Sequence, residues 1–295
     1  FGHLDATVVL SRDIAALGLQ VEVVPFTGTL PEIEHDGPVV CYGSTNFILN
    51  CRKAGRWIPG VWHDDENFTW SAWAKNFGEL LLNAPDSSER TTIAGLLASP
   101  RPDDELVFLR PDRDVKEFSG EVAAIRELKA WCRDVLAGCF DQIGPDTPIV
   151  VATPFGIEVE WRLFVVCGQV VAASRYRRRG RLDAREGAPA DVVAFGEAVA
   201  TRWSPATVFT LDVCRSGERL FVLEAQGFNS AGYYSADLQA LVRAERWRIL
   251  VGDDAHALDR MVRADPEQAY EPSFYERMAS EAGWRLNAIA GREPE

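Results

Sequence analysis

The sequence predicts an α+β protein, and three observations support that class. Segments of strand length alternate with segments of helical periodicity. Two strand pairs are separated by short turns typical of antiparallel hairpins. The phosphate-binding patterns GxGxxG and GxxxxGK followed by Ser or Thr are both absent. We therefore expect antiparallel hairpins packed against helices rather than a doubly wound parallel sheet.

Residues 1–90 predict a small α/β domain that precedes the main body. The predicted elements are strands over 21–26 and 38–43 and a helix from Ser44 or Thr45 to about Lys53. Loop-like segments follow at 84–90 and 98–104, and we place the domain boundary after residue 90.

Residues 91–250 predict the main domain, and residues 251–295 a charged tail packed on the body. The predicted elements are strands 106–109 and 148–152, helices 120–138, 188–202 and 235–250, and hairpins 158–167/169–176 and 206–213/219–225. In the first hairpin Gly168 predicts a type II′ turn, which would pair Arg162 with Arg175 and Glu160 with Arg177.

Composition excludes several classes of protein. The 295 residues are 47% hydrophobic and carry a net charge of −13, so we expect no general nucleic-acid binding. The apolar runs are too short to cross a membrane, and no signal peptide is visible. The six cysteines form no CxxC motif, which favours reduced, buried thiols and a cytoplasmic protein. Aromatic residues crowd the segment 57–73, where the acidic chain favours buried packing over an RNA-stacking surface.

The first hairpin carries an unusual polar face. Alternation along the strand places Glu158, Glu160, Arg162 and Phe164 on one side. This face predicts either a solvated surface with cross-strand ion pairs or a cleft that binds an anion. Five arginines within residues 175–181 of so acidic a chain favour the anion.

Because like charges directly opposite each other destabilise a sheet, the pair Arg162 and Arg175 predicts an anion site. We expect Arg162→Met to relieve the repulsion and to stabilise the ligand-free protein slightly.

The second hairpin carries Asp212 and Glu224 inside apolar strands. A loop of odd length would place both carboxylates on one face. A buried carboxylate needs a cation, so each acid either pairs with an arginine or binds a metal. Gln226 and Asn229 add amide oxygens, and this set of hard oxygen donors favours Mg²⁺.

In order along the chain, these features resemble the ATP-grasp superfamily over roughly residues 105 to 250. Arg110-Pro111 stands where many members have Lys-Pro, and the segment 148–153 resembles the hinge strand whose backbone meets adenine. Glu160-Trp-Arg162 resembles a strand of the glutathione-synthetase-like and RimK-like ligases. Asp212 with the segment 224–226 resembles the metal pair, and residues 227–234 resemble a branch in which Arg replaces the usual ATP-binding Lys.

The resemblance implies a fold of two α+β lobes that clasp ATP, and a set of site residues. The implied cofactor-binding residues are Arg110, Lys116, Val151, Ala152, Thr153 and Glu160; the catalytic ones are Arg162 and Arg175; the metal ligands are Asp212, Glu224, and Gln226 or Asn229. Three departures from the family pattern are Gln226 in place of Asn, few glycines in the phosphate loop 112–120, and Thr153 where many members have a ribose-binding Glu.

The implied function is an ATP- and Mg²⁺-dependent ligase that joins a carboxylate to an amine through an acyl phosphate. The implied partners are a small-molecule or peptide carboxylate and an amine, with no nucleic acid and no membrane. A homodimer stays open. The alternatives are a nucleotide-binding module without ligase activity and an ATP-dependent phosphotransferase.

Overall fold

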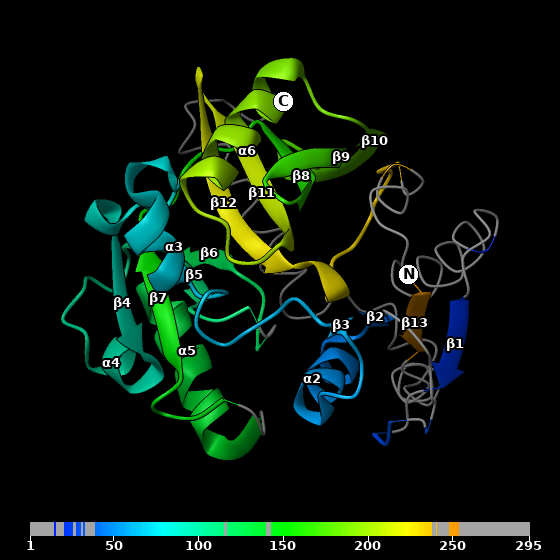
Figure 1. The fold of residues 1–295 in the computed structure, drawn as a ribbon. Helices are drawn as coiled ribbons and strands as arrows, with labels where there is room; N and C mark the ends of the chain where they lie inside the picture. Colours follow the sequence, from blue (N-terminus) through cyan, green and yellow to red (C-terminus); the bar gives the residue numbers. More distant parts are fainter. Residues whose placement is uncertain are drawn as a thin grey trace, which may run out of the picture.

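The computed structural model describes residues 15, 21–25, 28–30, 32, 39–114, 117–139, 143–237, 240 and 248–253, and the statements below concern those residues. They form three sheets with helices between and around them (Figure 1). None of the helices in this described part is long and apolar enough to cross a membrane.

The N-terminal sheet combines strands from both ends of the described chain. Its strand order is β1 (Val21–Pro25), β13 (Arg248–Asp253), β2 (Val39–Gly43) and β3 (Pro59–Gly60), and all its pairings are parallel. Helix α2 (Thr45–Ala54) follows β2 directly, and the side chain of Ser44 caps it by accepting a hydrogen bond from the backbone N–H of Phe47. The predicted strands and helix of this region are therefore confirmed.

The second sheet, here called the β7 sheet, is antiparallel. Its strand order is β4 (Ser88–Thr92), β7 (Pro148–Ala152), β5 (Leu106–Pro111) and β6 (Glu121–Ala124). Helices α4 (Ile93–Ala98) and α5 (Ile125–Asp134) cover one face and share a buried apolar core with it. Burial alternates along β5, so Val107 and Leu109 enter this core whereas Arg110 lies on the opposite face.

The third sheet, here called the large sheet, has five strands. Their order is β10 (Arg181–Glu186), β9 (Gln169–Arg178), β8 (Val159–Val166), β11 (Val208–Ser216) and β12 (Arg219–Gly227). Helices α6 (Ala190–Arg202) and α3 (Trp70–Phe77) pack with one face in the largest cluster of buried apolar residues. On the other face, Phe164 and Val166 pack with Tyr42 of the N-terminal sheet, while Glu160 and Arg162 lie further along the same strand.

The aromatic residues of the segment 57–73 lie in the cores, as the packing interpretation predicts. Phe68, Trp70 and Trp73 are buried in the core beneath the large sheet, and Trp57 is buried in the core of the N-terminal sheet. This burial leaves no stacking surface of those four rings for RNA.

The first hairpin forms, but its turn differs from the prediction. Cys167 and Gly168 are the two turn residues, with φ angles of 49° and 81°, and Val166 pairs with Gln169. Positive φ at both central positions is typical of a type I′ turn, so the predicted type II′ turn is wrong.

Two bulges in β9 then change which residues face each other. Glu160 pairs with Arg177 as predicted, but Ser174, not Arg175, lies opposite Arg162. A bulge inserts an extra residue and so shifts the register, which a count from the turn does not include. The predicted pairing of Arg162 with Arg175 is therefore wrong, and so is the like-charge repulsion inferred from it.

The second hairpin places its two carboxylates as predicted, by a different route. Its turn consists of Gly217 and Glu218 rather than three residues, because Ser216 pairs with Arg219. A bulge in β12 supplies the odd residue, and Asp212 pairs directly with Glu224.

Two predicted helices differ from the structure, and the two predicted boundaries cross strands. The first four residues after Gly120 form strand β6, because they pair with β5, and the helix begins only at Ile125. Residues 248–250, predicted as the end of a helix, belong to strand β13, and most of residues 238–247 lie outside the described part. The boundaries after 90 and 250 fall inside β4 and β13, since each strand pairs with a sheet from another part of the chain.

The described cysteines are free thiols, and Cys41, Cys51, Cys132 and Cys214 are buried. Cys167, which was expected among the buried ones, is exposed because it lies in the type I′ turn.

Candidate functional site

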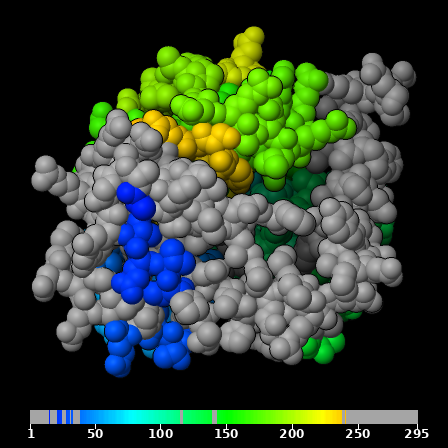
Figure 2. All heavy atoms as spheres, turned by 90° about the vertical axis from the view of Figure 1, so that its right-hand side faces the viewer, coloured from blue at the N-terminus to red at the C-terminus, as the bar shows by residue number. Residues whose placement is uncertain are grey.

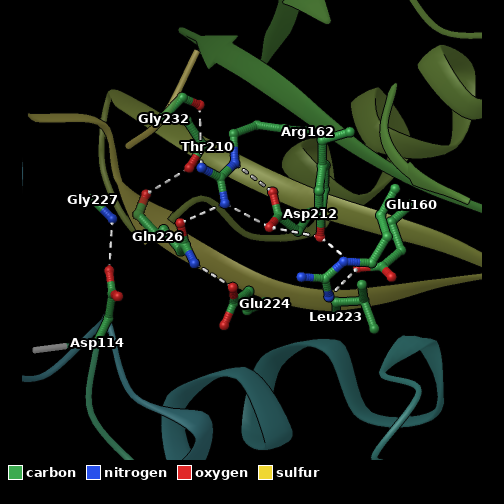
Figure 3. A network of polar contacts seen from close by, with 12 residues as sticks. Asp114, Glu160, Arg162, Thr210, Asp212, Leu223, Glu224, Gln226, Gly227 and Gly232 are labelled. Atoms are coloured by element: carbon green, nitrogen blue, oxygen red, sulfur yellow. Dashed lines mark hydrogen bonds and ion pairs between the residues drawn. The ribbon is translucent and has the colours of Figure 1, made fainter. Parts of the chain in front are cut away.

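A row of charged side chains crosses the middle of the large sheet on the face away from α6. Asp212 pairs with Arg162 of β8 on one side and with Glu224 of β12 on the other. Directly paired residues project from the same face, so all three side chains meet there (Figure 3). Apolar strand neighbours bury the row.

Arg162 and Asp212 form a two-pronged ion pair. Arg162 donates from Nε to Oδ1 at 2.8 Å and from Nη2 to Oδ2 at 2.7 Å. The two residues are 5% and 1% exposed, so this pair is desolvated. Burial works against the charge on Arg162, but the Asp212 carboxylate outweighs burial and raises the pKa of the guanidinium.

The remaining donors of Arg162 are also used. Nη2 donates to Oε1 of Gln226 at 2.8 Å, and Nη1 donates to the backbone carbonyl of Gly232 at 3.2 Å (Figure 3). The rings of Tyr176 and Tyr234 lie 5.6 Å and 5.3 Å from the guanidinium carbon. Arg162 therefore connects β11, β12 and the segment that follows β12.

Tyr176 links two carboxylates of this face. Its hydroxyl lies 2.8 Å from Oε2 of Glu160 and 3.2 Å from Oδ2 of Asp212. Burial and the two nearby carboxylates raise the pKa of Tyr176 well above its ordinary value, which keeps the phenol protonated as a donor. Burial also raises the pKa of Glu160, and Arg177 and Tyr176 oppose that rise.

Sequence reasoning missed Tyr176 and Tyr234 as parts of the site. Tyr176 is the extra residue of a bulge in β9, so strict alternation from the turn does not assign it to this face. The run Arg-Tyr-Arg in a strand beside buried acids was the available signal. Tyr234 follows the strand and is stacked on Tyr176, a contact that only the folded chain reveals.

Arg110 reaches across from the β7 sheet to the large sheet. It donates to Oε2 of Glu224 at 2.8 Å and to the carbonyl of Leu223 at 3.1 Å. Its guanidinium carbon lies 4.8 Å from the ring centre of Trp73, and its buried Nε has no partner among the described residues. Asp114, at the start of the predicted phosphate loop, accepts a hydrogen bond from the backbone N–H of Gly227 at 3.0 Å (Figure 3). The site therefore lies where the two sheets meet.

The two candidate amide ligands lie in different surroundings. Gln226 contacts both Arg162 and Glu224, so it belongs to the charged row. Asn229 accepts from the backbone N–H of Trp62 at 2.8 Å and donates to the carbonyls of Cys41 and Gly60. These contacts tie Asn229 to the N-terminal part, and none of them involves Asp212 or Glu224.

Other predicted residues lie at the edges of this arrangement or outside it. Arg175 forms an ion pair with Asp183 of β10 at 2.7 Å instead of facing Arg162. Val151 and Ala152 are buried in β7, which pairs with β4 and β5 on its two sides, and Thr153 follows at the end of the strand. Lys116 lies outside the described residues.

The charged row has donor chemistry that fits a magnesium ion in part. Asp212 and Glu224 provide hard oxygen atoms on one face, but each shares oxygens with an arginine. Among the described residues no three His, Cys, Asp or Glu side chains are grouped so that they would hold a metal by themselves. A cation here would therefore need further oxygen ligands, such as those of phosphates.

Comparisons with known proteins identify this arrangement. The family model described as an ATP-grasp domain, family 3 of its clade, matches residues 53–244. The solved structure of D-cycloserine synthetase DcsG aligns with 82% of this chain and 96% of its own, at 14% identity and a TM-score of 0.53. No curated protein gives a significant match.

More distant similarity extends to two further solved structures. ATP-grasp ligase PsnB, complexed with a minimal precursor, aligns with 68% of this chain and 67% of its own, at 15% identity and a TM-score of 0.40. A RimK domain protein of Sphaerobacter thermophilus aligns with 60% of this chain and 62% of its own, at 13% identity and a TM-score of 0.41. The chain thus matches about two thirds or less of the length of these two proteins. At such identities the similarity concerns the fold alone.

Proposed function

Because this chain belongs to the ATP-grasp domains, in family 3 of its clade, we propose that it is an ATP- and Mg²⁺-dependent ligase that joins a carboxylate to an amine. The observation that carries this proposal is the meeting of charges between two sheets: Arg110 of the β7 sheet lies 2.8 Å from Glu224 of the large sheet, beside the Arg162–Asp212 pair. Cations and carboxylates at one junction provide what a bound nucleotide and its metal require.

Asp212 and Glu224 would hold magnesium together with the nucleotide phosphates, because Mg²⁺ is commonly bound by one or two carboxylates and substrate phosphates. When bound, the ion would neutralise charge on the transferred phosphoryl group. Arg110 would turn from Glu224 toward the phosphates, aided by Trp73 at its face. Residues 151–153 and Glu160 are proposed to line the nucleotide site, as in the family pattern.

The proposed reaction has two steps. The acceptor carboxylate attacks the γ-phosphorus of ATP, ADP leaves, and an acyl phosphate forms. The amine then attacks the acyl carbon, loses a proton, and expels inorganic phosphate, which leaves an amide. Arg162 would stabilise the negative charge that develops in both steps through its position beside Asp212. Arg175, paired with Asp183, is proposed to act only after that pair opens.

A second candidate is a nucleotide-binding module without ligase activity. It is favoured by one observation: Arg162 and Asp212 use their polar groups on each other, Gln226, Gly232 and Tyr176, so neither has a spare donor or acceptor aimed at a substrate. Turnover separates the two candidates.

The test combines nucleotide binding with ADP release. Calorimetry of Asp212→Asn and Glu224→Gln with Mg-ATP should show a loss of magnesium-dependent binding, because an amide does not supply an anionic ligand. Asp183→Asn and Asp191→Asn, which remove carboxylates paired with arginine away from the charged row, are matched controls and should bind normally. Thermal melts verify that each variant is folded.

ADP release by the wild-type protein is then screened with pairs of carboxylates and amines. Release that requires both acceptors supports the ligase. Tight Mg-ATP binding without release in any pair supports the module, and wild-type affinity in both site variants contradicts the metal assignment.

A further inference from the structure

The hairpin of β9 and β10 carries a concentration of arginine that the site does not use. Residues 175–186 include six arginines and two acidic residues, in a chain whose net charge is −13. In Figure 2 the light-green segment that contains this hairpin stands at the surface in the upper part of the face, above a hollow. A strongly positive projection on an acidic body attracts a negatively charged partner.

The arginines near the base of this hairpin are paired, whereas those at its turn are not. Arg175 and Arg185 both contact Asp183, at 2.7 Å and 3.2 Å, and Arg177 lies 3.7 Å from Glu160. The arginines at the turn are exposed and form no ion pair with any described residue. They are Arg178, Arg179 and Arg181.

The turn that presents these arginines is structurally defined. Arg179 and Gly180 have φ angles of 47° and 75°, which is typical of a type I′ turn. The backbone N–H of Arg179 also donates to the carbonyl of Glu158 at 2.8 Å, which ties the turn to β8. A preorganised turn loses less entropy when it binds a partner.

Strand β10 is the outer strand of the large sheet. Within the described part of the chain its outer edge pairs with no further strand, so it offers backbone N–H and C=O groups to an added strand. Leu182, in the middle of β10, is 75% exposed and adds an apolar contact at the same place. The opposite outer strand, β12, lacks such an open edge because Leu81 bridges to Val222.

Charged side chains also protect edge strands from unwanted pairing. That role needs charge of either sign, whereas here all unpaired charges at the turn are positive and the body is acidic. From the open edge and the charge together, we propose that β10 and its turn bind an acidic polypeptide segment in extended conformation. Backbone hydrogen bonds would run along β10, and Asp or Glu side chains of the partner would pair with the three turn arginines.

A peptide fits these observations better than a nucleic acid does. An edge strand recognises backbone amides, which nucleic acids lack. A long phosphate backbone would also extend from the hairpin onto a body with a net charge of −13 and be repelled there.

The test uses the full chain and a fluorescent peptide of alternating Glu and Thr, with binding followed by anisotropy at low and high salt. Arg178→Ala/Arg179→Ala/Arg181→Ala should weaken binding by about ten-fold or more. The matched control, Arg126→Ala/Arg133→Ala/Arg202→Ala, removes three exposed helical arginines and should stay within about two-fold of wild type. A peptide with alternate amides N-methylated should also bind about ten-fold more weakly, because it cannot add to the sheet edge.

Three results would overturn the proposal. Equal binding by the wild type and the hairpin variant excludes the turn arginines as the site. Equal binding of the N-methylated peptide excludes strand addition. A single-stranded RNA oligonucleotide that binds more tightly than the peptide and displaces it assigns the surface to nucleic acid. Because the measurement contains no ATP, its outcome is independent of ligase activity.

Discussion

Two groups of arginines on neighbouring strands of the large sheet differ in their surroundings. Arg162 is 5% exposed and donates to Asp212, Gln226 and Gly232, whereas the three arginines at the β9–β10 turn are exposed without a described ion-pair partner. The residue type is the same, and only burial differs. The difference teaches that the interior admits a charge only with its counter-charge and hydrogen bonds in place, while water substitutes for both at the surface.

The largest expected effect comes from removing the buried cation. Arg162→Met leaves Asp212 buried without its counter-ion, so we expect the free energy of unfolding to fall by about 3–5 kcal/mol. This reverses the expectation drawn from the sequence, because Arg162 faces Asp212 and not Arg175. Urea denaturation measures the change.

The matched control is the double variant Arg162→Met/Asp212→Leu. It replaces the whole pair by apolar groups and should recover most of the loss. If Arg162→Met alone melts like the wild type, the pair is not desolvated as described.

A smaller effect is expected from the hydroxyl that links the two carboxylates. Tyr176→Phe removes hydrogen bonds to Glu160 and Asp212 while keeping the ring beneath Arg162, and should cost about 2 kcal/mol. Tyr234→Phe keeps the other ring over Arg162 and removes a hydroxyl from a side chain that is 45% exposed, so it should change stability by less than about 0.5 kcal/mol. Equal losses in the two variants would show that ring packing, not hydrogen bonding, matters.

A buried acid without a counter-ion sharpens the comparison through pH. In Glu121, Oε2 is buried without a partner among the described residues, and burial together with Glu127 raises the pKa of Glu121 to about 7. The folded state thus binds this proton more tightly than the unfolded chain does. Its contribution to stability is fully present below the usual pKa of about 4.5 and is lost as pH rises through about 7.

Glu121→Gln should therefore match the wild type near pH 4 and be more stable at pH 8 by about 1 kcal/mol, after allowance for solvent screening. Thermal melts across this range measure the difference. A constant difference at all pH values would exclude titration of Glu121 as its cause.

The smallest effect is expected at the surface. Replacing the three turn arginines by alanine should change the free energy of unfolding by less than about 0.5 kcal/mol, because no described residue depends on them. The same urea denaturation as for Arg162 gives the comparison directly. A loss above about 1 kcal/mol would mean that these arginines have structural partners.

Local pattern determined most of the elements. The strand 148–152 and the helix capped by Ser44 follow from apolar runs, capping chemistry and turn residues, which act between near neighbours. The pairing of Asp212 with Glu224 also followed, because both lie in one hairpin and an odd residue was needed between them. Residues 121–124 were missed because pairing with β5 overrode their helical spacing.

By itself, the sequence determined the class of fold, the apolar cores and the residues that carry charge into them. Only the tertiary structure decided which charges meet. Bulges in β9 separated Arg162 from Arg175, and a contact between two sheets brought Arg110 to Glu224 over more than a hundred residues of chain. The physical reason is that a bulge changes register without a local sequence signal, and that a buried charge selects its partner from everything the fold places within hydrogen-bonding distance.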